Sequence, residues 1–270
     1  MPATIISLIN QKGGCGKSST CFHLSGSFSL AGFRVLIVDA DPQGSLGQAF
    51  FGSVQVEQLS AAETLTAIFD DAGFCSRPWE LAVETQFNGI SIVRANQTLA
   101  PHNTPQPELS GLRQGIMRDF LRHLDGYDLI LIDCPPNLYQ SSWNALVAAD
   151  FVLIPVPPED FGTQGLRVVH QAIEQARILN PKLNLLGHLI TRCDHRLLIH
   201  RTYEDKLRKK YGDSVLQTVI PEASAFKVSL TCRQPVNHHA PISRAAITTS
   251  LLATEILERV ARATAERRVA

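Results

Sequence analysis

A glycine-rich segment between an apolar run and a helix-like stretch places the strongest constraint on how this chain can fold. Residues 10–20 read NQKGGCGKSST and follow the apolar run Ile5–Ile9, with a helix expected from Lys17 to Ala31. The glycines allow several backbone N–H groups to point at one anion without a Cβ in the way. The N-terminus of the following helix adds positive potential. The segment therefore predicts a phosphate-binding loop at the end of a buried strand.

The loop fits the pattern K-G-G-x-G-K-[ST] from Lys12 to Ser18. The more general pattern G-x-x-x-x-G-K-[ST] fails, because Gln11 stands where its first glycine should be. In such loops the Lys17 ammonium reaches the β- and γ-phosphates, and the Ser18 hydroxyl ligates Mg²⁺. We expect the phosphates to contact Lys12, Gly13, Gly14, Cys15, Gly16, Lys17, Ser18 and Ser19.

Acidic residues follow two further apolar runs. The run Val35–Val38 leads into Asp39 and Asp41, and the run Leu129–Ile132 leads into Asp133. Open α/β sheets bind ligands at the carboxyl ends of their strands. A single aspartate there is more often a loop or cap residue, but beside a phosphate loop we expect Asp133 to hold a metal-bound water. Asp39 or Asp41 could orient an attacking water, and the predicted metal ligands are Ser18, Asp39 and Asp133.

Apolar runs alternate with helix-like stretches along the chain, without an internal repeat or a convincing domain boundary. Strands that are apolar throughout and separated by helices are typical of a parallel sheet covered on both faces. We therefore expect one α/β domain over residues 1–270, with a mostly parallel twisted sheet. Beyond those already named, the expected strands are 90–93, 151–155, 185–190 and 215–220, and the expected helices are 109–124, 140–149, 163–179, 198–211 and 241–268.

Composition and charge narrow the function classes. Apolar residues make up 44% of the chain, which is ordinary for a globular protein. No apolar stretch reaches the length of a membrane span, and no secretory signal is recognised, so we expect a cytoplasmic protein with six reduced, mostly buried cysteines. The net charge is zero, but residues 1–165 carry 8 basic and 16 acidic side chains and residues 166–270 carry 17 and 9. This asymmetry is compatible with a polyanion-binding surface or with two halves that neutralise each other.

With these motifs in place, the chain resembles the ParA-type partition ATPases of the ParA/MinD superfamily. The matching segments spread over most of the chain in the family's order: Asn10–Thr20, Arg34–Gly44, Tyr127–Pro136, Asn144–Glu159 and Tyr211–Pro221. The resemblance implies a P-loop NTPase fold with a deviant Walker A loop, which binds ATP and Mg²⁺ and forms a homodimer around two ATP molecules. It also implies slow hydrolysis without a stimulating partner.

The resemblance assigns roles to individual residues. Lys12 is the signature lysine that crosses to the partner's phosphates, and Lys17 is the phosphate lysine within the subunit. Asp41 matches the acid that positions the attacking water, and Asp133 matches the Walker B acid. Pro221 and the turn 191–194 lie where the family binds the base, which makes Pro221 a further nucleotide contact.

Two departures from the family pattern leave these expectations in place. Cys15 stands where a small aliphatic residue is usual, and Ser18-Ser19 replaces a common Thr-Thr. Both keep the required size and hydroxyl groups, although Cys15 raises a question of oxidation beside the phosphates. We expect no helix-turn-helix extension before the ATPase core.

The basic C-terminal part suggests what the ATPase acts on. Lys and Arg contacts to DNA phosphates are independent of sequence and sensitive to salt, and ParA-like dimers bind nonspecific double-stranded DNA through this part of the chain. A solvated amphipathic helix is the plainer explanation of the same charges. The family implies a nucleoid-associated ATPase that positions a plasmid, a chromosome origin or a protein complex, stimulated by a ParB-like or cargo-adaptor partner. The candidate DNA contacts are Arg196, Arg201, Lys206, Arg208 and Lys209.

Three other interpretations remain open at this point. A MinD-like regulator would use the last helix as a membrane anchor, but packing on the sheet explains its apolar stripe (Leu251, Leu252, Ile256, Leu257, Val260) more simply. The tail lacks bulky apolar residues, so membrane binding is not expected.

An iron–sulfur reductase would need cysteines placed to ligate a cluster. Cys134 directly follows Asp133, and this position does not suit a cluster ligand. A small-molecule ligase on the same fold shows no substrate pocket in the sequence.

Overall fold

The structure is a computed structural model that describes residues 2–70, 77–158 and 163–269. Glu159, the last residue of one matching segment, and Cys75, one of the six cysteines, lie outside the described residues. Most of the strands begin and end within one residue of the predicted positions. The strands are β1 (Thr4–Leu8), β2 (Val35–Asp39), β3 (Ala82–Glu84), β4 (Ile90–Val93), β5 (Leu129–Asp133), β6 (Phe151–Val156) and β7 (Asn184–Ile190).

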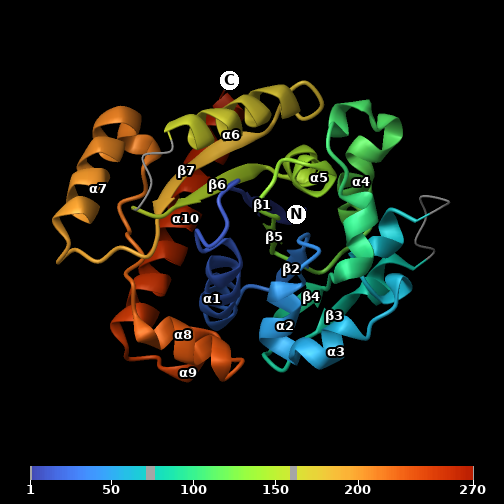
Figure 1. Ribbon diagram of the computed structural model, residues 1–270, viewed down its shortest axis with the longest axis horizontal. Helices are drawn as coiled ribbons and strands as arrows, with labels where there is room; N and C mark the ends of the chain where they lie inside the picture. Colours follow the sequence, from blue (N-terminus) through green and yellow to red (C-terminus); the bar gives the residue numbers. More distant parts are fainter. Residues whose placement is uncertain (1, 71–76, 159–162, 270) are drawn as a thin grey trace.

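These strands form one sheet, in the order β3-β4-β2-β5-β1-β6-β7 (Figure 1). Every pairing is parallel except that of β3 with β4. The helices between the strands are α1 (Lys17–Leu30), α2 (Ser45–Phe51), α3 (Ser53–Glu57), α4 (Ile116–Leu121), α5 (Gln140–Ala148), α6 (Thr163–Ala176), α7 (Leu198–Tyr211), α8 (Ser224–Thr231), α9 (Val236–His239) and α10 (Arg244–Val269).

Successive residues of each central strand point to opposite faces, and both faces are buried. Val35 and Ile37 of β2 pack in a cluster with residues of α1 and α10. Their neighbours Leu36 and Val38 pack in a second cluster with residues of α4, α5 and α6. A strand covered on both sides must be apolar at every position, which explains the unbroken apolar runs in the sequence. The predicted α/β class and helix-covered parallel sheet are confirmed (Figure 1).

The predicted strand 215–220 is wrong. The segment touches β7 at separate points and forms no continuous ladder: Val215 makes an isolated bridge with His188, and the N–H groups of Leu216 and Ile220 donate to β7 carbonyls at 2.9 Å. Between these points the N–H groups of Gln217 and Thr218 turn away from the sheet and donate to the two carboxylate oxygens of Glu255 on α10, each at 2.8 Å. The segment is apolar because it packs under α10 and not because it extends the sheet.

The predicted helix 109–124 is also largely wrong. The structure has two 3₁₀ turns, Pro107–Leu109 and Gly111–Gly115, before α4 begins at Ile116. Gly111 lies in the left-handed region with φ of 60°, which an α-helix cannot contain. The antiparallel edge strand β3 and the short helices α2, α3, α8 and α9 were not predicted.

His23 joins α1 to the C-terminal helices. Its side chain is buried, and its Nδ1 accepts a hydrogen bond from the Val236 N–H at 3.0 Å. Burial lowers the pKa of His23 to about 3. Below about pH 6.5 the unfolded chain therefore binds a proton at this histidine that the folded chain does not.

We therefore predict that replacing His23 by Asn weakens the acid sensitivity of the fold. Between about pH 6.5 and pH 3 the histidine should lower the wild-type free energy of unfolding by about 1.4 kcal/mol for each unit of falling pH. The His23→Asn variant keeps an acceptor for the Val236 N–H but does not titrate. Urea unfolding of both proteins at pH 7.5, 6 and 5 measures the difference. A difference in stability that is the same at all three pH values would contradict the prediction.

Candidate functional site

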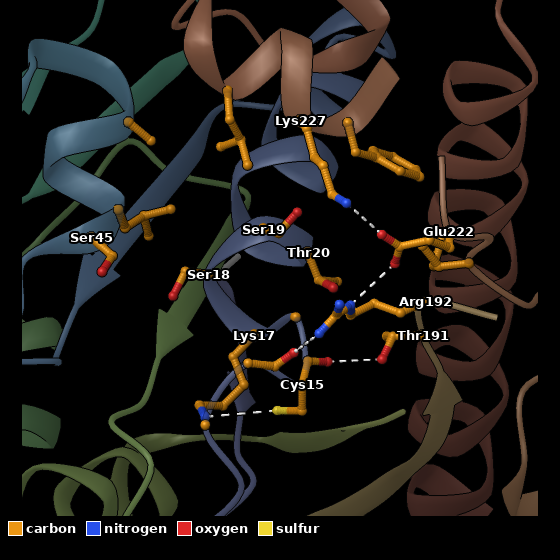
Figure 2. A pocket seen from close by; sticks show the side chains of 18 of the residues that line it. Cys15, Lys17, Ser18, Ser19, Thr20, Ser45, Thr191, Arg192, Glu222 and Lys227 are labelled. Atoms are coloured by element: carbon orange, nitrogen blue, oxygen red, sulfur yellow. Dashed lines mark hydrogen bonds and ion pairs between the residues drawn. The ribbon is translucent and has the colours of Figure 1, made fainter. Parts of the chain in front are cut away.

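A cleft of about 490 Å³ opens where the carboxyl ends of β1, β2 and β5 meet the start of α1. Figure 2 shows that α8 and the segment after β7 form its opposite wall. The sheet register brings Leu8 and Asp39 to either side of Asp133. The cleft is lined by residues 13–20, Asp41, Ser45, Leu46, Ala49, Pro136, Thr191, Arg192, Ile220, Pro221, Glu222, Ala223, Phe226, Lys227 and Leu230.

The glycines of the loop serve two different purposes. Gly14 and Gly16 have φ of 70° and 90°, which a residue with a side chain rarely adopts. Gly16 is also the residue from which α1 begins. A Cβ at Gly13 would meet no atom within 4 Å, so this glycine is not required by the protein's own packing. Its bare backbone instead leaves room for a ligand to approach the loop closely.

The segment after β7 holds the loop from behind. The Thr191 hydroxyl donates to the Cys15 carbonyl at 2.8 Å, and the Arg192 guanidinium donates to the Gly14 carbonyl at 3.0 Å (Figure 2). Two loop carbonyls are therefore engaged from the β7 side. The loop geometry depends on a contact between residues about 176 positions apart in the sequence.

Lys17 is buried at the base of the loop, with 7% of its surface exposed. Its ammonium donates to the carbonyls of Asn10 at 3.0 Å and Lys12 at 3.2 Å. The Cys15 sulfur lies 3.8 Å from it (Figure 2). Burial raises the pKa of the Cys15 thiol. The thiol stays protonated at neutral pH, which makes Cys15 a poor target for oxidation.

Asp133 is a fully buried carboxylate whose oxygens accept no hydrogen bond from any residue that the structure describes. Burial raises its pKa to about 7, against the lowering effect of the nearby Ser18 hydroxyl and Lys17 ammonium. A buried polar group without a partner is costly. A cation that accepted its lone pairs would remove this cost, so the residues present fit a bound metal ion.

Asp39 is the neighbour of Asp133 across the β2–β5 pairing and is equally buried. Burial and the adjacent Asp133 raise its pKa well above the usual range. Unlike Asp133, it accepts backbone hydrogen bonds, from Leu46 and Gly47 at 3.0 Å and from Asp41 at 3.2 Å. Both Leu46 and Gly47 belong to the first turn of α2. Of the two predicted acids, Asp133 is therefore the one with oxygens left for a metal ion.

Asp41 and Lys12 lie in different surroundings. Asp41 lines the cleft, where its carboxylate accepts the Gln43 N–H at 2.9 Å. Lys12 lines a separate cavity of about 110 Å³, together with Val156 of β6 and Tyr203 of α7. The cleft thus brings together Lys17, Ser18, Ser19 and Asp41, while Lys12 belongs to the neighbouring cavity.

A chain of three charged side chains crosses the mouth of the cleft, and the sequence analysis missed two of them. Glu222 accepts from Arg192 at 3.1 Å and from Lys227 of α8 at 2.7 Å (Figure 2). Arg192 has φ of 55°, an uncommon conformation for a residue with a side chain. The prediction that the turn 191–194 and Pro221 lie at the nucleotide site pointed to this region. No local motif marks Glu222 or Lys227, because the three residues meet only in the folded chain.

An apolar wall continues from this chain of charges. Pro221, Ile220, Ala223, Phe226 and Leu230 all line the cleft. A flat aromatic group could pack there while phosphates occupy the glycine-rich end. Pro221, the one base contact predicted by number, lies in this wall.

The five candidate DNA contacts differ in their exposure. Four of them are exposed: Arg196, Arg201, Lys206 and Lys209. Arg208 is half-buried, and it donates to Glu204 at 2.9 Å and to the carbonyl of Leu216 at 3.1 Å. These contacts fasten α7 to the segment before α8. Arg196 is paired with Asp194 at 2.7 Å.

The apolar stripe of the last helix is mostly internal. Leu252 and Ile256 are fully buried in the cluster that also contains α1, whereas Leu251 is 59% exposed. Packing against the rest of the domain therefore accounts for most of the stripe. Among the described helices, none combines the length and the apolar character that crossing a membrane would require.

Comparisons with known proteins agree with this geometry. A family model described as an AAA domain matches residues 3–185. The chain is 34% identical to the chromosome-partitioning ATPase Soj of Thermus thermophilus, over 94% of this chain and 96% of Soj. It is 31% identical to the chromosome partitioning protein ParA of Myxococcus xanthus, over 98% and 92% of the two chains.

A solved structure adds a second line of comparison. Cobyrinic acid a,c-diamide synthase from Mycobacterium smegmatis, solved with bound ADP and magnesium, is 28% identical and covers 94% of each chain, with a TM-score of 0.77. The glycine-rich loop, the buried Asp133 and these relatives lead to one assignment. The chain belongs to the ParA-type ATPases of the ParA/MinD superfamily.

Proposed function

We propose that this protein binds ATP with Mg²⁺ in the cleft, forms a homodimer around the nucleotides and hydrolyses ATP slowly to ADP and phosphate. The observation that carries the proposal is the position of the unpartnered Asp133 carboxylate beside Lys17 and Ser18 at the base of the loop. A fully buried acid without a hydrogen-bond partner is destabilising unless a ligand uses it. The ADP and magnesium of the mycobacterial structure support the same ligand class.

Each residue around the phosphates would have a different role. Ser18 and Asp133 would hold Mg²⁺, which when bound neutralises charge on the phosphates. Lys17 would exchange its present contacts with the Asn10 and Lys12 carbonyls for the phosphate oxygens. Asp39 would keep its backbone contacts and hold α2 in place. Asp41, at the edge of the cleft, would orient the attacking water.

Lys12 would act on the nucleotide of the second subunit. It does not share the cleft with Lys17 but lines the adjoining cavity beside β6 and α7. A positive charge on the developing γ-phosphate accelerates phosphoryl transfer. If Lys12 supplies that charge only across an interface, hydrolysis depends on dimerisation. The rate of ATP hydrolysis then sets how long the dimer lasts.

The dimer would bind nonspecific double-stranded DNA and position or segregate a cargo in the cytoplasm, on the nucleoid. Three exposed basic residues of α7 support this step: Arg201, Lys206 and Lys209. A ParB-like or cargo-adaptor protein would stimulate hydrolysis and release the dimer. Membrane attachment of the MinD kind is less well supported, since Leu252 and Ile256 of the last helix are buried.

A small-molecule ligase is the second candidate, because the mycobacterial relative is named as a diamide synthase. A ligase needs an acid substrate at the γ-phosphate and turns ATP over only when that substrate is present. Hydrolysis stimulated by DNA and an adaptor in the absence of any organic acid would exclude it.

The first prediction on function concerns the two loop lysines. With a non-hydrolysable ATP analogue and Mg²⁺, the wild type should elute as a dimer in size-exclusion chromatography with light scattering. Lys17→Ala should weaken analogue binding by about tenfold or more, because a charge-assisted contact is lost. Lys12→Ala should bind the analogue but stay monomeric, and its hydrolysis should fall by about 10²-fold or more.

Lys209→Ala is the matched control, since it removes an exposed lysine far along α7 and should still dimerise. The proposal fails if Lys12→Ala forms the dimer and hydrolyses ATP at the wild-type rate. It also fails if the wild type remains a monomer at saturating analogue.

The second prediction concerns DNA. In the analogue-bound state, the double variant Lys206→Ala/Lys209→Ala should bind any duplex more weakly than the wild type. Each lost phosphate contact should make the slope of log K against log salt shallower by about 0.9. Lys182→Ala, which removes an exposed lysine outside α7, should keep the wild-type slope. Fluorescence anisotropy with two unrelated duplexes at several salt concentrations measures this, and flotation with anionic vesicles tests the membrane alternative.

The third prediction concerns Asp133. Because its folded pKa of about 7 lies above the unfolded value near 3.9, it should make the nucleotide-free wild type less stable as pH rises from about 4 to 7. Asp133→Asn should remove that loss, so its advantage in unfolding free energy should grow between pH 5 and pH 8. The same variant should lose the extra stability that Mg²⁺ gives the ATP complex. Urea unfolding measures both, and a pH-independent difference would contradict the assignment.

A further inference from the structure

A cysteine, a histidine and a glutamate converge at the turn between β7 and α7, outside the nucleotide cleft. Cys193 and His195 lie in the turn, and Glu204 lies on α7. Their ligand atoms all lie within 4.8 Å of one another. The Cys193 sulfur is 3.9 Å from His195 Nδ1, and that nitrogen is 3.8 Å from Glu204 Oε2.

We propose that Cys193, His195 and Glu204 bind one Zn²⁺-class transition-metal ion, with water as the fourth ligand. A thiolate, an imidazole and a carboxylate are the ligands that Zn²⁺ prefers, whereas Mg²⁺ avoids sulfur and nitrogen. Three protein ligands and one open position are the arrangement of zinc sites that keep a bound water. The proposal is independent of the proposed function, because it uses no residue of the nucleotide cleft.

The distances suit such an ion once the three ligand groups move closer together. With ligand bonds of about 2.0–2.3 Å, the edges of a tetrahedral site are about 3.3–3.6 Å. The two separations given above exceed these values by a few tenths of an ångström, and the third, between the Cys193 sulfur and the Glu204 carboxylate, lies within 4.8 Å. Cys193 is buried, with 1% of its surface exposed, but His195 is exposed. The histidine is thus free to swing toward the sulfur, and it leaves an entry path for the ion.

The neighbours of the three ligands orient one of them and leave the other nearby side chains engaged elsewhere. Arg208 donates to the Oε1 atom of Glu204 at 2.9 Å, which leaves Oε2 turned toward His195. A group that holds the second oxygen of a ligating carboxylate fixes its orientation. Asp194 is neutralised by Arg196 at 2.7 Å, and the His200 Nδ1 accepts the Asp194 N–H at 2.9 Å. Neither Asp194 nor His200 therefore competes for the ion with these atoms.

A bound ion would join α7 to the rim of the cleft. The backbone of Cys193 pairs with the neighbouring segment, since its N–H donates to Ile220 and its carbonyl accepts from Glu222, both at 3.0 Å. Glu222 holds Arg192 and Lys227 at the cleft mouth. The metal would close the loop 193–204 and limit the motion of α7 relative to that rim.

Titration of the chelator-treated full-length protein with Co²⁺, in the presence of excess Mg²⁺, tests the site. We expect one Co²⁺ per chain, with tetrahedral d–d bands and a thiolate-to-cobalt charge-transfer band, and displacement by Zn²⁺. Cys193→Ser should abolish the charge-transfer band. His195→Gln, which alters an exposed side chain and should fold normally, should weaken Co²⁺ binding by about tenfold or more.

Cys232→Ser is the matched control, because Cys232 is the exposed cysteine among those described and lies after α8. It should keep the bands and the affinity of the wild type. The proposal is overturned if the wild type gives no thiolate band, if the band survives Cys193→Ser, if His195→Gln binds Co²⁺ as tightly as the wild type, or if Cys232→Ser abolishes binding.

Discussion

Two carboxylates placed side by side at the carboxyl ends of β2 and β5 impose the main electrostatic constraint on this fold. Adjacent strands lie about 4.8 Å apart, so Asp39 and Asp133 share one buried, low-dielectric space. The nearby Asp133 raises the pKa of Asp39, in addition to the effect of burial. The first turn of α2 compensates Asp39 with backbone N–H groups. Asp133 is left with Lys17 and Ser18 as its nearby support, which links the stability of the empty domain to its readiness for a cation.

The loop geometry follows from the same constraint. Lys17 is held inward by the carbonyls of Asn10 and Lys12, so its charge is already desolvated before a ligand arrives. Preorganised charges of this kind cost stability in the empty protein and strengthen ligand binding. Thr191 and Arg192 hold the other loop carbonyls from the β7 side. The conformation of the loop is therefore supported by the segments that follow β1 and β7 and not by its glycines alone.

The sequence was sufficient for those features that depend on local or repeating patterns. Apolar runs located β1, β2, β4, β5, β6 and β7, and the spacing of lysine, glycine and serine located the loop. Prediction from the sequence failed where the local structure depends on a side chain that is distant in the sequence. Glu255 accepts the N–H groups of Gln217 and Thr218, so an apolar run that is typical of a strand does not form a continuous strand beside β7. Glu222 and Lys227 meet Arg192 from separate elements, and Arg208 is used for internal packing although its sequence context is that of a surface basic residue.

The segment after β7 contacts the phosphate loop, the cleft mouth and the segment before α8 within a few residues. Arg192 has a left-handed backbone, which costs on the order of 1–2 kcal/mol. Its side chain offsets this cost by contacting Gly14 in the loop and Glu222 across the cleft. Cys193, the next residue, pairs through its backbone with Ile220 and Glu222. A displacement of α7 would therefore act on the phosphate loop through covalently adjacent residues, and a ligand that pulled Arg192 away from Gly14 would act on α7 in return, because energetic coupling between two sites is reciprocal.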